Sequence, residues 1–230
     1  MIIRYVKYTL SLLFGFLTIS NSYSQRTYEP KFYIGGHAGV TLSRINFSPS
    51  IPQGFIMGKQ FGISGRYAEE SNFGLIGEVN FMQRGWSESF DDAPLSYKRT
   101  LNYINIPILT HIFFGNNKFK GFFNLGPEVS YMISESESSN FDINQPNANS
   151  GFPNTHRSEQ YKMAVTTKFD YGISAGAGIE LIIANKHSVM LDGRFYYGLG
   201  NIFPSHKTDY FSASPNMSII VSLGYMIRVK

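Results

Sequence analysis

The feature that most limits the fold of this chain is a long alternation of apolar and polar residues. Between residues 168 and 183 every odd position is apolar, and most even positions hold Gly, Ser or a charged residue. Side chains of a β-strand point alternately to the two faces of a sheet, so a period of two predicts a strand and excludes a helix. The run also exceeds the usual strand of about five or six residues, which indicates an unusually long strand.

The same period of two recurs along most of the chain, less regularly in its first half. The other predicted strands are residues 32–43, 58–68, 73–86, 98–114, 120–133, 187–199 and 217–229. Short connections lie at 69–72, 115–119 and 184–186, and long ones at 44–57, 87–97, 134–167 and 200–215. Short turns on one side and long loops on the other are typical of membrane barrels. The pattern predicts an all-β fold, an eight-stranded antiparallel transmembrane β-barrel with up-and-down connections.

The polar face of these strands carries small residues and a balanced set of charges. Its ionisable members are Arg66, Glu78, Arg84, Glu128, Lys168, Asp170, Glu180, Asp192, Arg194 and Arg228. This balance predicts a paired network, because an unpaired buried charge is very costly. We therefore expect the apolar face to meet lipid and the polar face to fill the lumen, which leaves no open pore in an eight-stranded barrel. A soluble, lipocalin-like barrel with the two faces reversed is the alternative.

Aromatic residues are abundant, with 20 Phe, 15 Tyr and 1 Trp among 230 residues. Those near the ends of predicted strands are Tyr67, Trp86, Tyr97, Tyr131, Phe169 and Tyr197. Membrane barrels carry girdles of aromatic side chains at both interfaces, so we expect these residues to face the lipid headgroups. The 22 Gly leave room inside the barrel for long charged side chains, and the mean hydropathy of −0.14 is the average of the two faces.

The N-terminus has the organisation of an export signal. Arg4 and Lys7 precede an apolar stretch at 8–19, and small residues follow up to Ser24. This order predicts a cleaved signal peptide at 1–24 and a single barrel domain at 25–230, because the stretch is shorter than the about 20 residues that span a bilayer. The chain has no Cys, which excludes disulfides, thiolate metal sites and a lipoprotein anchor. With an even number of strands, both termini are expected on the short-turn, periplasmic side.

Several short motifs resemble one known family. They are Gly58-Lys59-Gln60-Phe61-Gly62, Phe73-Gly74-Leu75, Leu101-Asn102-Tyr103-Ile104-Asn105-Ile106-Pro107-Ile108, residues 170–178 and Leu223-Gly224-Tyr225. Over residues 30–230 the pattern is similar to that of the Bacteroidetes outer-membrane β-barrel family called PorT-like, and the Ser24-Gln25 junction is typical of that phylum. The resemblance implies an eight-stranded outer-membrane barrel without one fixed activity. Because the family's namesake is a component of type IX secretion, a role accessory to protein secretion is implied by the resemblance alone.

The histidines are the main candidates for chemistry. His37 and His111 fall on the lumen face, where hydrogen-bonded core residues are expected. His156 and His206 lie in the two longest loops together with Ser and Asp residues, so a loop-based membrane hydrolase is one alternative. No G-x-S-x-G motif supports that activity. The sequence predicts no catalytic residue, and the chain is not expected to be an enzyme.

The long loops offer two further features. Glu135, Glu137 and Asp142 lack the spacing of a calcium-binding loop, so no metal and no cofactor are expected. The last loop is apolar at its tip, and its aromatic residues are expected to pack on the barrel rim, with contact to a partner or ligand as the alternative. These residues are Phe203, Tyr210 and Phe211.

Charge and location together limit the partners. Loss of Arg4 and Lys7 with the signal lowers the formal net charge from +4 to +2, which does not favour nucleic acid. We expect a monomeric barrel that contacts outer-membrane lipid and an envelope protein, through the loops or the periplasmic face. The predicted function is a structural, binding or accessory role carried by the loops. A small-molecule-binding or narrow transport barrel is the second alternative beside the hydrolase.

Overall fold

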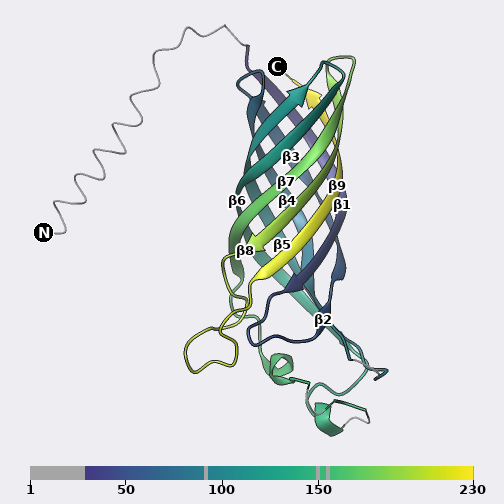
Figure 1. Cartoon of the computed structure of the whole chain (residues 1–230), viewed down its shortest axis with the longest axis vertical. Coiled ribbons are helices and arrows are strands. Elements are labelled where there is room, and N and C mark those ends of the chain that lie inside the picture. Colours follow the sequence, from purple (N-terminus) through teal and green to yellow (C-terminus); the bar gives the residue numbers. More distant parts are fainter. Residues whose placement is uncertain (1–28, 91–92, 149–150, 154–155, 230) are drawn as a thin grey trace, which may run out of the picture.

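The computed structural model of the chain describes residues 29–90, 93–148, 151–153 and 156–229. These residues form one closed barrel of tilted strands with long loops at one end (Figure 1). The long strands are β1 (Lys31–Ile45), β3 (Ile56–Ala68), β4 (Phe73–Glu88), β5 (Tyr97–Gly115), β6 (Phe119–Ser139), β7 (Phe169–Ile183), β8 (His187–Gly198) and β9 (Asn216–Arg228). The short elements are β2 (Gln53–Gly54) and the 3-10 helices η1 (Pro146–Ala148) and η2 (Glu159–Lys162). The predicted signal peptide lies outside the described residues.

Each long strand pairs antiparallel with the next long strand in the sequence, and the last one closes on the first. The closing pair is β1 with β9, in which Ala38 lies opposite Leu223. This pairing confirms the eight-stranded up-and-down barrel predicted from the alternation. The structure adds β2, which pairs with the loop end of β4 and places Gln53 opposite Glu88. No helix in the described ranges has the length and apolarity needed to cross a membrane.

The two faces of the barrel wall are divided as the alternation predicts. Large apolar side chains point outward, and Ile63, Ile108 and Leu223 are 58–68% exposed. The charged and amide side chains of the other parity point inward, where Arg84 and Asn105 are 1% and 0% exposed. A continuous apolar outer belt around a polar interior is the arrangement of a membrane barrel, and it is the reverse of a barrel that faces water.

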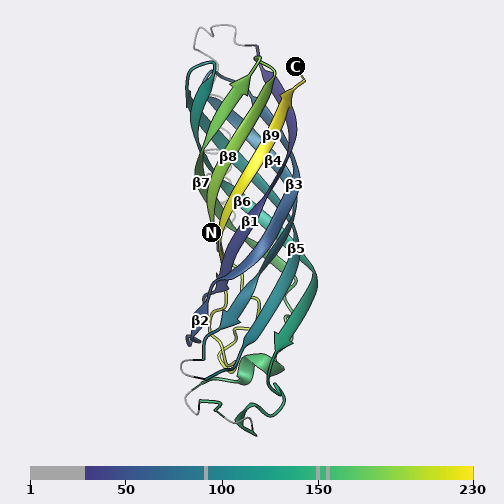
Figure 2. The same cartoon turned by 90° about the vertical axis from the view of Figure 1, so that its right-hand side faces the viewer.

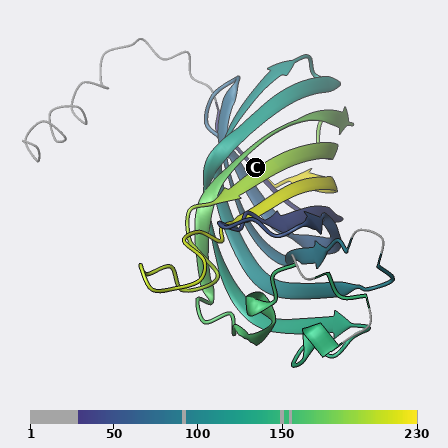
Figure 3. The same ribbon diagram turned by 60° about the horizontal axis from the view of Figure 1, so that its bottom comes forward.

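The two ends of the barrel differ. The connections at 69–72, 116–118 and 184–186 and the last described residues lie at one end, and the long loops lie at the other (Figures 1 and 2). Figure 3 brings the loop end forward and shows the loops gathered beside the barrel mouth. Here β4, β5 and β6 extend beyond the predicted strands, and β6 reaches Ser139 instead of residue 133. The alternation misses this extension because residues 134–139 are only Ser and Glu.

The predicted aromatic girdle is correct in four of its six members. Tyr67, Tyr131, Phe169 and Tyr197 are 38–54% exposed on the outer surface. The prediction was wrong for Trp86 and Tyr97, which are both 0% exposed. These two residues share the parity of the inward side chains on β4 and β5, so they point into the loop end and leave the lipid interface to the other four.

Candidate functional site

The lumen contains three clusters of charged side chains. In the first, Arg66 on β3 reaches Glu180 on β7 with two hydrogen bonds, from Nη1 to Oε2 at 3.0 Å and from Nη2 to Oε1 at 2.7 Å. The guanidinium also lies 4.1 Å from the ring centre of Tyr33. His111 is next to this pair: its Nε2 lies 3.4 Å from Arg66 and its Nδ1 lies 2.8 Å from Asn124. His111 is thus a hydrogen-bonded core residue.

The second cluster has the same two-pronged geometry. Arg194 on β8 donates from Nη1 and Nη2 to the two carboxylate oxygens of Glu78 on β4, at 2.7 and 2.6 Å. Its Nε donates to Asp192 on the same strand. His37 completes the cluster, with its Nε2 at 3.7 Å from Glu78. Two-pronged guanidinium–carboxylate contacts fix direction as well as distance, so both partners are held in one orientation.

These two clusters cross the lumen from one wall to the opposite wall. Around the barrel the order is β1, β3, β4, β5, β6, β7, β8 and β9. In a ring of eight, β3 lies opposite β7 and β4 lies opposite β8. The ion pairs Arg66–Glu180 and Arg194–Glu78 therefore act as two struts through the interior at different heights.

The third cluster fills the lumen nearer the loops. Arg84 is 1% exposed and donates to Glu128 on β6 and to Asp170 on β7, the latter at 3.2 Å. Its guanidinium lies 4.0 Å from the ring centre of Tyr196. Glu128 also accepts hydrogen bonds from Ser174 at 2.6 Å and from an Asn amide. One cation is thus matched with two carboxylates that share several other donors.

The three clusters include eight of the ten residues predicted for the lumen network. Lys168 and Arg228 lie outside them, which corrects that prediction. Lys168 is exposed just before β7, and Arg228 ends β9 at the opposite rim. Parity alone placed them inside, but Lys168 lies before the start of its strand, and Arg228, still paired with Tyr33 of β1, lies at the open rim and is half-buried. The cavities left between the clusters are small, about 20 Å³ beside His37 and about 10 Å³ beside Arg66.

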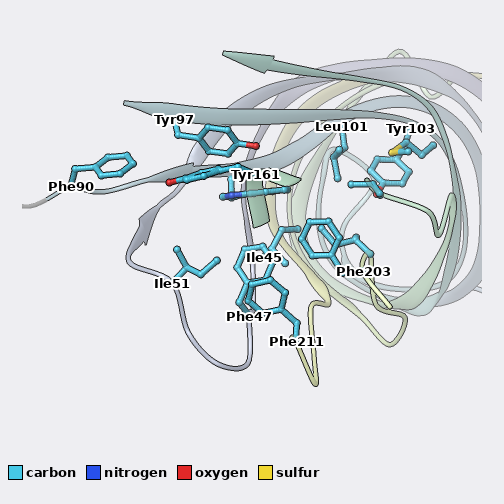
Figure 4. Close-up of a cluster of buried hydrophobic side chains, with 14 of the residues drawn as sticks. Ile45, Phe47, Ile51, Phe90, Tyr97, Leu101, Tyr103, Tyr161, Phe203 and Phe211 are labelled. Atoms are coloured by element: carbon cyan, nitrogen blue, oxygen red, sulfur yellow. The ribbon is translucent and has the colours of Figure 1, made fainter. Parts of the chain in front are cut away.

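A second buried region lies outside the barrel, among the long loops. Its side chains come from the ends of β1, β4, β5 and β6 and from all four long loops, and they converge on a shared aromatic centre (Figure 4). We call this cluster the loop cap. Its buried members are Ile45, Phe47, Ile51, Trp86, Phe90, Tyr97, Leu101, Tyr103, Met132, Phe152, Tyr161, Val165, Ile202, Phe203 and Phe211. The loops thus have a hydrophobic core of their own.

Glu88 is the polar centre of the loop cap. Its carboxylate accepts hydrogen bonds from Trp86 Nε1 at 3.2 Å, Gln160 Nε2 at 3.0 Å and Tyr161 Oη at 2.6 Å. His156 Nε2 lies 2.8 Å from it, and the imidazole stacks on the ring of Phe90. The end of β4 thereby holds the loop segment 156–161 in place. Burial and the neighbouring Glu88 raise the pKa of Tyr161, so its hydroxyl stays protonated and donates.

A glycine allows β4 to enter the cap. Gly85 has a φ of +147°, and a Cβ there would lie 2.0 Å from the carbonyl oxygen of Arg99 on β5. Its amide donates to Ser43 Oγ at 3.0 Å. A side chain at this position would separate the two strands, so Gly85 is required where the barrel wall passes into the loop cap.

The three aromatic residues of the last loop have different environments. Phe203 and Phe211 are 1% and 0% exposed, and they stack on each other inside the loop cap. These two residues therefore pack at the barrel rim. Tyr210 is 40% exposed, and its hydroxyl accepts a hydrogen bond from Arg157 Nη1 at 2.7 Å. Only Tyr210 of the three is available to a partner.

The acidic and histidine residues of the loops are engaged in structural contacts. Glu135 and Glu137 both pair with Arg99, at 2.8 and 2.9 Å. Among the described residues no group of His, Asp and Glu has the arrangement of a metal site. His156 is bound to Glu88, whereas His206 is exposed and its backbone amide donates to Asp209. The two histidines therefore belong to separate local structures and do not form one catalytic arrangement.

The sequence matches the outer membrane protein beta-barrel domain family over residues 15–204. The chain belongs to this family. The protein is therefore an outer-membrane β-barrel, which agrees with its apolar outer belt. No curated protein matches the sequence.

Among solved structures, the barrel is similar to three small outer-membrane proteins. Neisserial surface protein A is 12% identical, with a TM-score of 0.45 and coverage of 87% of this chain and 99% of that chain. OprG of Pseudomonas aeruginosa is 11% identical, with a TM-score of 0.49 and coverage of 86% and 95%. Ail of Yersinia pestis, in complex with the heparin analogue sucrose octasulfate, is 13% identical, with a TM-score of 0.41 and coverage of 86% and 99%.

In this outer-membrane barrel, sequence reasoning missed the centre of the loop cap. The strand predicted at 73–86 ends before Glu88, although Glu88 continues the inward parity of Arg84 and Trp86 on β4. Extending the predicted strand by two residues, from 86 to 88, includes Glu88. Gln160 and Tyr161 carry no comparable signal, because they reach Glu88 from an irregular segment far along the chain.

Proposed function

We propose that the protein is a non-enzymatic, non-conducting outer-membrane barrel that acts by binding another envelope protein through its loop cap. The observation that carries the proposal is the pair of struts, Arg66–Glu180 and Arg194–Glu78, which join opposite walls of the lumen. They leave the interior without the continuous water-filled path of a transport barrel. Function is then left to the ends of the barrel, and among the described residues the loop end alone has a hydrophobic core outside the barrel.

The loop cap is suited to binding because it is ordered before a partner arrives. Its exposed rim includes Phe55 and Tyr210, which are 47% and 40% exposed and lie beside Arg44 and Arg157. Aromatic and Arg side chains are enriched in protein interfaces. A rigid core beneath such a rim reduces the conformational entropy that is lost when a partner binds.

The finer identity of the protein is part of the same proposal. The motifs quoted above support a PorT-like member of the Bacteroidetes family, with a signal peptide at 1–24 and one mature domain at 25–230. The proposal puts both termini and the short turns in the periplasm and the loop cap outside the cell. A role accessory to protein secretion follows from the family resemblance, and the loop cap would then contact a secretion component or its cargo.

Conductance and orientation can be tested on the purified protein and on whole cells. In planar bilayers the protein should give no ion channels, and steady openings would overturn the non-conducting barrel. The chain has no native Cys, so Lys207→Cys in the last loop and Asn117→Cys in a short turn each provide a single label. A membrane-impermeant maleimide should label the first in intact cells and the second only after permeabilisation. The reverse pattern would overturn the orientation.

Binding through the loop cap can be tested by site-specific photocrosslinking in living cells. A benzophenone amino acid at Tyr210 should give a protein adduct, because this side chain is exposed on the cap rim. The same group at Leu223, 60% exposed on the lipid-facing belt, is the matched control and should give no discrete protein adduct. Adducts from Asn185 in a short turn, with none from Tyr210, would move the binding surface to the other end of the barrel.

A further inference from the structure

At the loop end, part of the barrel wall continues as a sheet beyond the closed barrel. This sheet consists of β2 and the ends of β4, β5 and β6, which pair in that order. The strand β7 does not follow β6 into it, because their pairing ends at Tyr131 opposite Phe169, with one more backbone bond from Met132 to Lys168. Residues 133–139 of β6 are therefore the last strand of this sheet, and we call their outer side the open edge.

The two borders of this sheet differ. On one side β2 covers the end of β4, with Gln53 opposite Glu88. On the other side, residues 133–139 make no backbone hydrogen bond within the described part of the chain except to β5, and all of them are exposed. Strand residues direct their amide and carbonyl groups to the two sides in alternation. The open edge therefore presents unpaired backbone groups, which are a template for another strand.

The loop that returns from β6 to β7 does not cover the open edge. Arg99 Nη1 on β5 donates to the carbonyl oxygen of Met163 at 2.9 Å, and Val165 is buried in the loop cap. Arg99 has the inward parity of Tyr97 and Leu101. The returning segment therefore lies against the inner face of the sheet, and the open edge is left to solvent.

The side chains of the open edge differ between its two faces. Glu135 and Glu137 both pair with Arg99, at 2.8 and 2.9 Å, and their side chains are still 33% and 30% exposed. One cation against two carboxylates leaves this face with a negative balance. The other face carries only small hydroxyl side chains, those of Ser134, Ser136 and Ser138. Side chains of this size leave the backbone of the open edge accessible.

We propose that the open edge binds an extended, basic segment of a partner protein as an added strand. The inference rests on the proposed function, and it states which kind of segment the loop end binds. Backbone hydrogen bonds along residues 133–139 supply affinity, and Lys or Arg side chains beside Glu135 and Glu137 supply specificity. At about 3.4 Å per residue, the open edge is about 24 Å long, enough for a strand of ordinary length.

A second copy of the chain fits the open edge poorly. If two open edges paired antiparallel, Glu135 and Glu137 of one copy would lie opposite the same carboxylates of the other. Like charges directly opposite each other destabilise a strand pair. A strand with cations at these positions turns the repulsion into attraction, so the charge of the open edge favours a basic partner segment.

Calorimetric titration of the full mature chain in micelles of a non-ionic detergent tests the open edge. The probe is a synthetic peptide of seven residues that alternates Thr with Lys, and the control peptide has Glu in place of Lys. The basic peptide should bind one per barrel and about tenfold more tightly than the acidic one, because opposite charges stabilise cross-strand pairs. Equal binding of the two peptides, or no binding of the basic one, would overturn the proposal.

Backbone methylation shows whether the peptide binds as a strand. Two forms of the basic peptide keep its charge, one N-methylated at the odd positions and one at the even positions. Only one set of amides faces β6, so one form should bind about tenfold more weakly and the other should bind as before. An equal loss in both forms, or a loss in neither, would contradict strand addition.

Hydrogen exchange locates the bound peptide. Amides within residues 133–139 should exchange more slowly when the basic peptide is present. Amides of residues 53–54, in the strand β2 that covers the opposite border of the sheet, are the internal control and should not change. Protection elsewhere in the chain, with none at 133–139, would place the peptide at another site and overturn the proposal.

Matched variants test the charge of the open edge. Glu135→Gln with Glu137→Gln should remove the preference for the basic peptide, while the amide oxygens can still accept hydrogen bonds from Arg99. Glu69→Gln with Glu70→Gln makes the same charge change in an exposed short turn and should keep the preference. The emission of Trp86 and heat-modifiable gel migration confirm the fold of each variant. Loss of the preference in both pairs would assign it to the net charge of the chain.

Failure of this inference and failure of the proposed function are distinguishable. A benzophenone amino acid at Ser138 should give the same protein adduct in cells as the one at Tyr210. An adduct from Tyr210 alone, with no peptide binding in micelles, would overturn the open edge and leave the proposed function. Peptide binding without any adduct from Tyr210 would contradict the proposed function instead. A dimer in micelles whose residues 133–139 are protected without peptide would assign the open edge to a second copy and overturn the proposal.

Discussion

The lumen and the loop cap bury charge in different ways. In the lumen each buried guanidinium faces at least one carboxylate from a strand far along the sequence, as Arg84 faces Glu128 and Asp170. In the loop cap one carboxylate, Glu88, is bound mainly by the neutral donors Trp86, Gln160 and Tyr161. The lumen clusters connect the walls of the whole barrel, whereas Glu88 connects one strand end to one loop. The loop cap should therefore be able to open while the barrel stays folded. Loss of the ion-pair struts, in contrast, should unfold the barrel.

The largest expected effect is in the lumen. Arg84→Met leaves Glu128 and Asp170 buried without their cation, which should lower the free energy of unfolding by about 3–5 kcal/mol. Urea unfolding in lipid vesicles, followed by heat-modifiable gel migration, measures it. Lys98→Met changes an exposed cation on β5 and should have almost no effect. Adding Glu128→Gln and Asp170→Asn to Arg84→Met should restore most of the loss. A loss equal to that of Lys98→Met would contradict the role of this cluster.

The next effect should be confined to the loop cap. Glu88→Gln replaces an oxygen that accepts hydrogen bonds by an amide that donates, so at least one buried donor loses its partner at a cost of about 1–3 kcal/mol. The emission of Trp86, the only Trp of the chain, should shift to longer wavelength, and proteolysis within 141–167 should increase. Glu159→Gln in the exposed part of the same loop should do neither. Altered gel migration of the barrel would show that the two regions are not independent.

The sequence predicts the barrel far better than the cap, and the reason is physical. A strand that separates lipid from a polar lumen must alternate at every position, so parity alone places Ile63 outside and Glu78 inside. The cap obeys no such period: Phe47, Phe203 and Tyr161 meet from three irregular segments. Parity also fails at the ends, where it put Lys168 and Arg228 in the lumen network although Lys168 precedes β7 and Arg228 lies at the open rim. Parity also does not identify which residues pair across the lumen, because these pairs depend on which strands lie opposite each other in the closed barrel.

The pH dependence of the cap gives a third test. Burial, followed by Glu88, raises the pKa of Tyr161 above its ordinary value of 10.0. Because the pKa is raised in the folded state, Tyr161 loses its proton at a lower pH when its loop is unfolded. The protonated hydroxyl therefore stabilises the folded cap fully below pH 10, and this stabilisation is lost as the pH rises above 10. The loss should be about 1.4 kcal/mol per pH unit for one proton. Emission of Trp86 should report opening at alkaline pH while the barrel persists.

Tyr161→Phe separates this titration from the rest of the cap. It removes the ionisable hydroxyl and should flatten the alkaline transition, at a cost of about 1 kcal/mol at neutral pH from the lost hydrogen bond to Glu88. Tyr197→Phe on the exposed outer girdle is the control and should leave the transition unchanged. An unchanged transition in Tyr161→Phe would assign the opening to another residue of the loop cap. The first candidate is Tyr97, because burial raises its pKa as well.

The smallest effect is expected where the cap meets solvent. Arg157 Nη1 donates to the Tyr210 hydroxyl at 2.7 Å, and this exposed contact connects the last two long loops. Cation–aromatic contacts at exposed sites are worth about 0.5–1 kcal/mol, so Arg157→Ala should barely change Trp86 emission or protease resistance. Lys207→Ala in the neighbouring loop is the control. A shift as large as that of Glu88→Gln would mean that the exposed rim, and not the buried carboxylate of Glu88, holds the loops together. The contrast between ion pairs in the lumen and one central carboxylate in the loop cap would then be wrong.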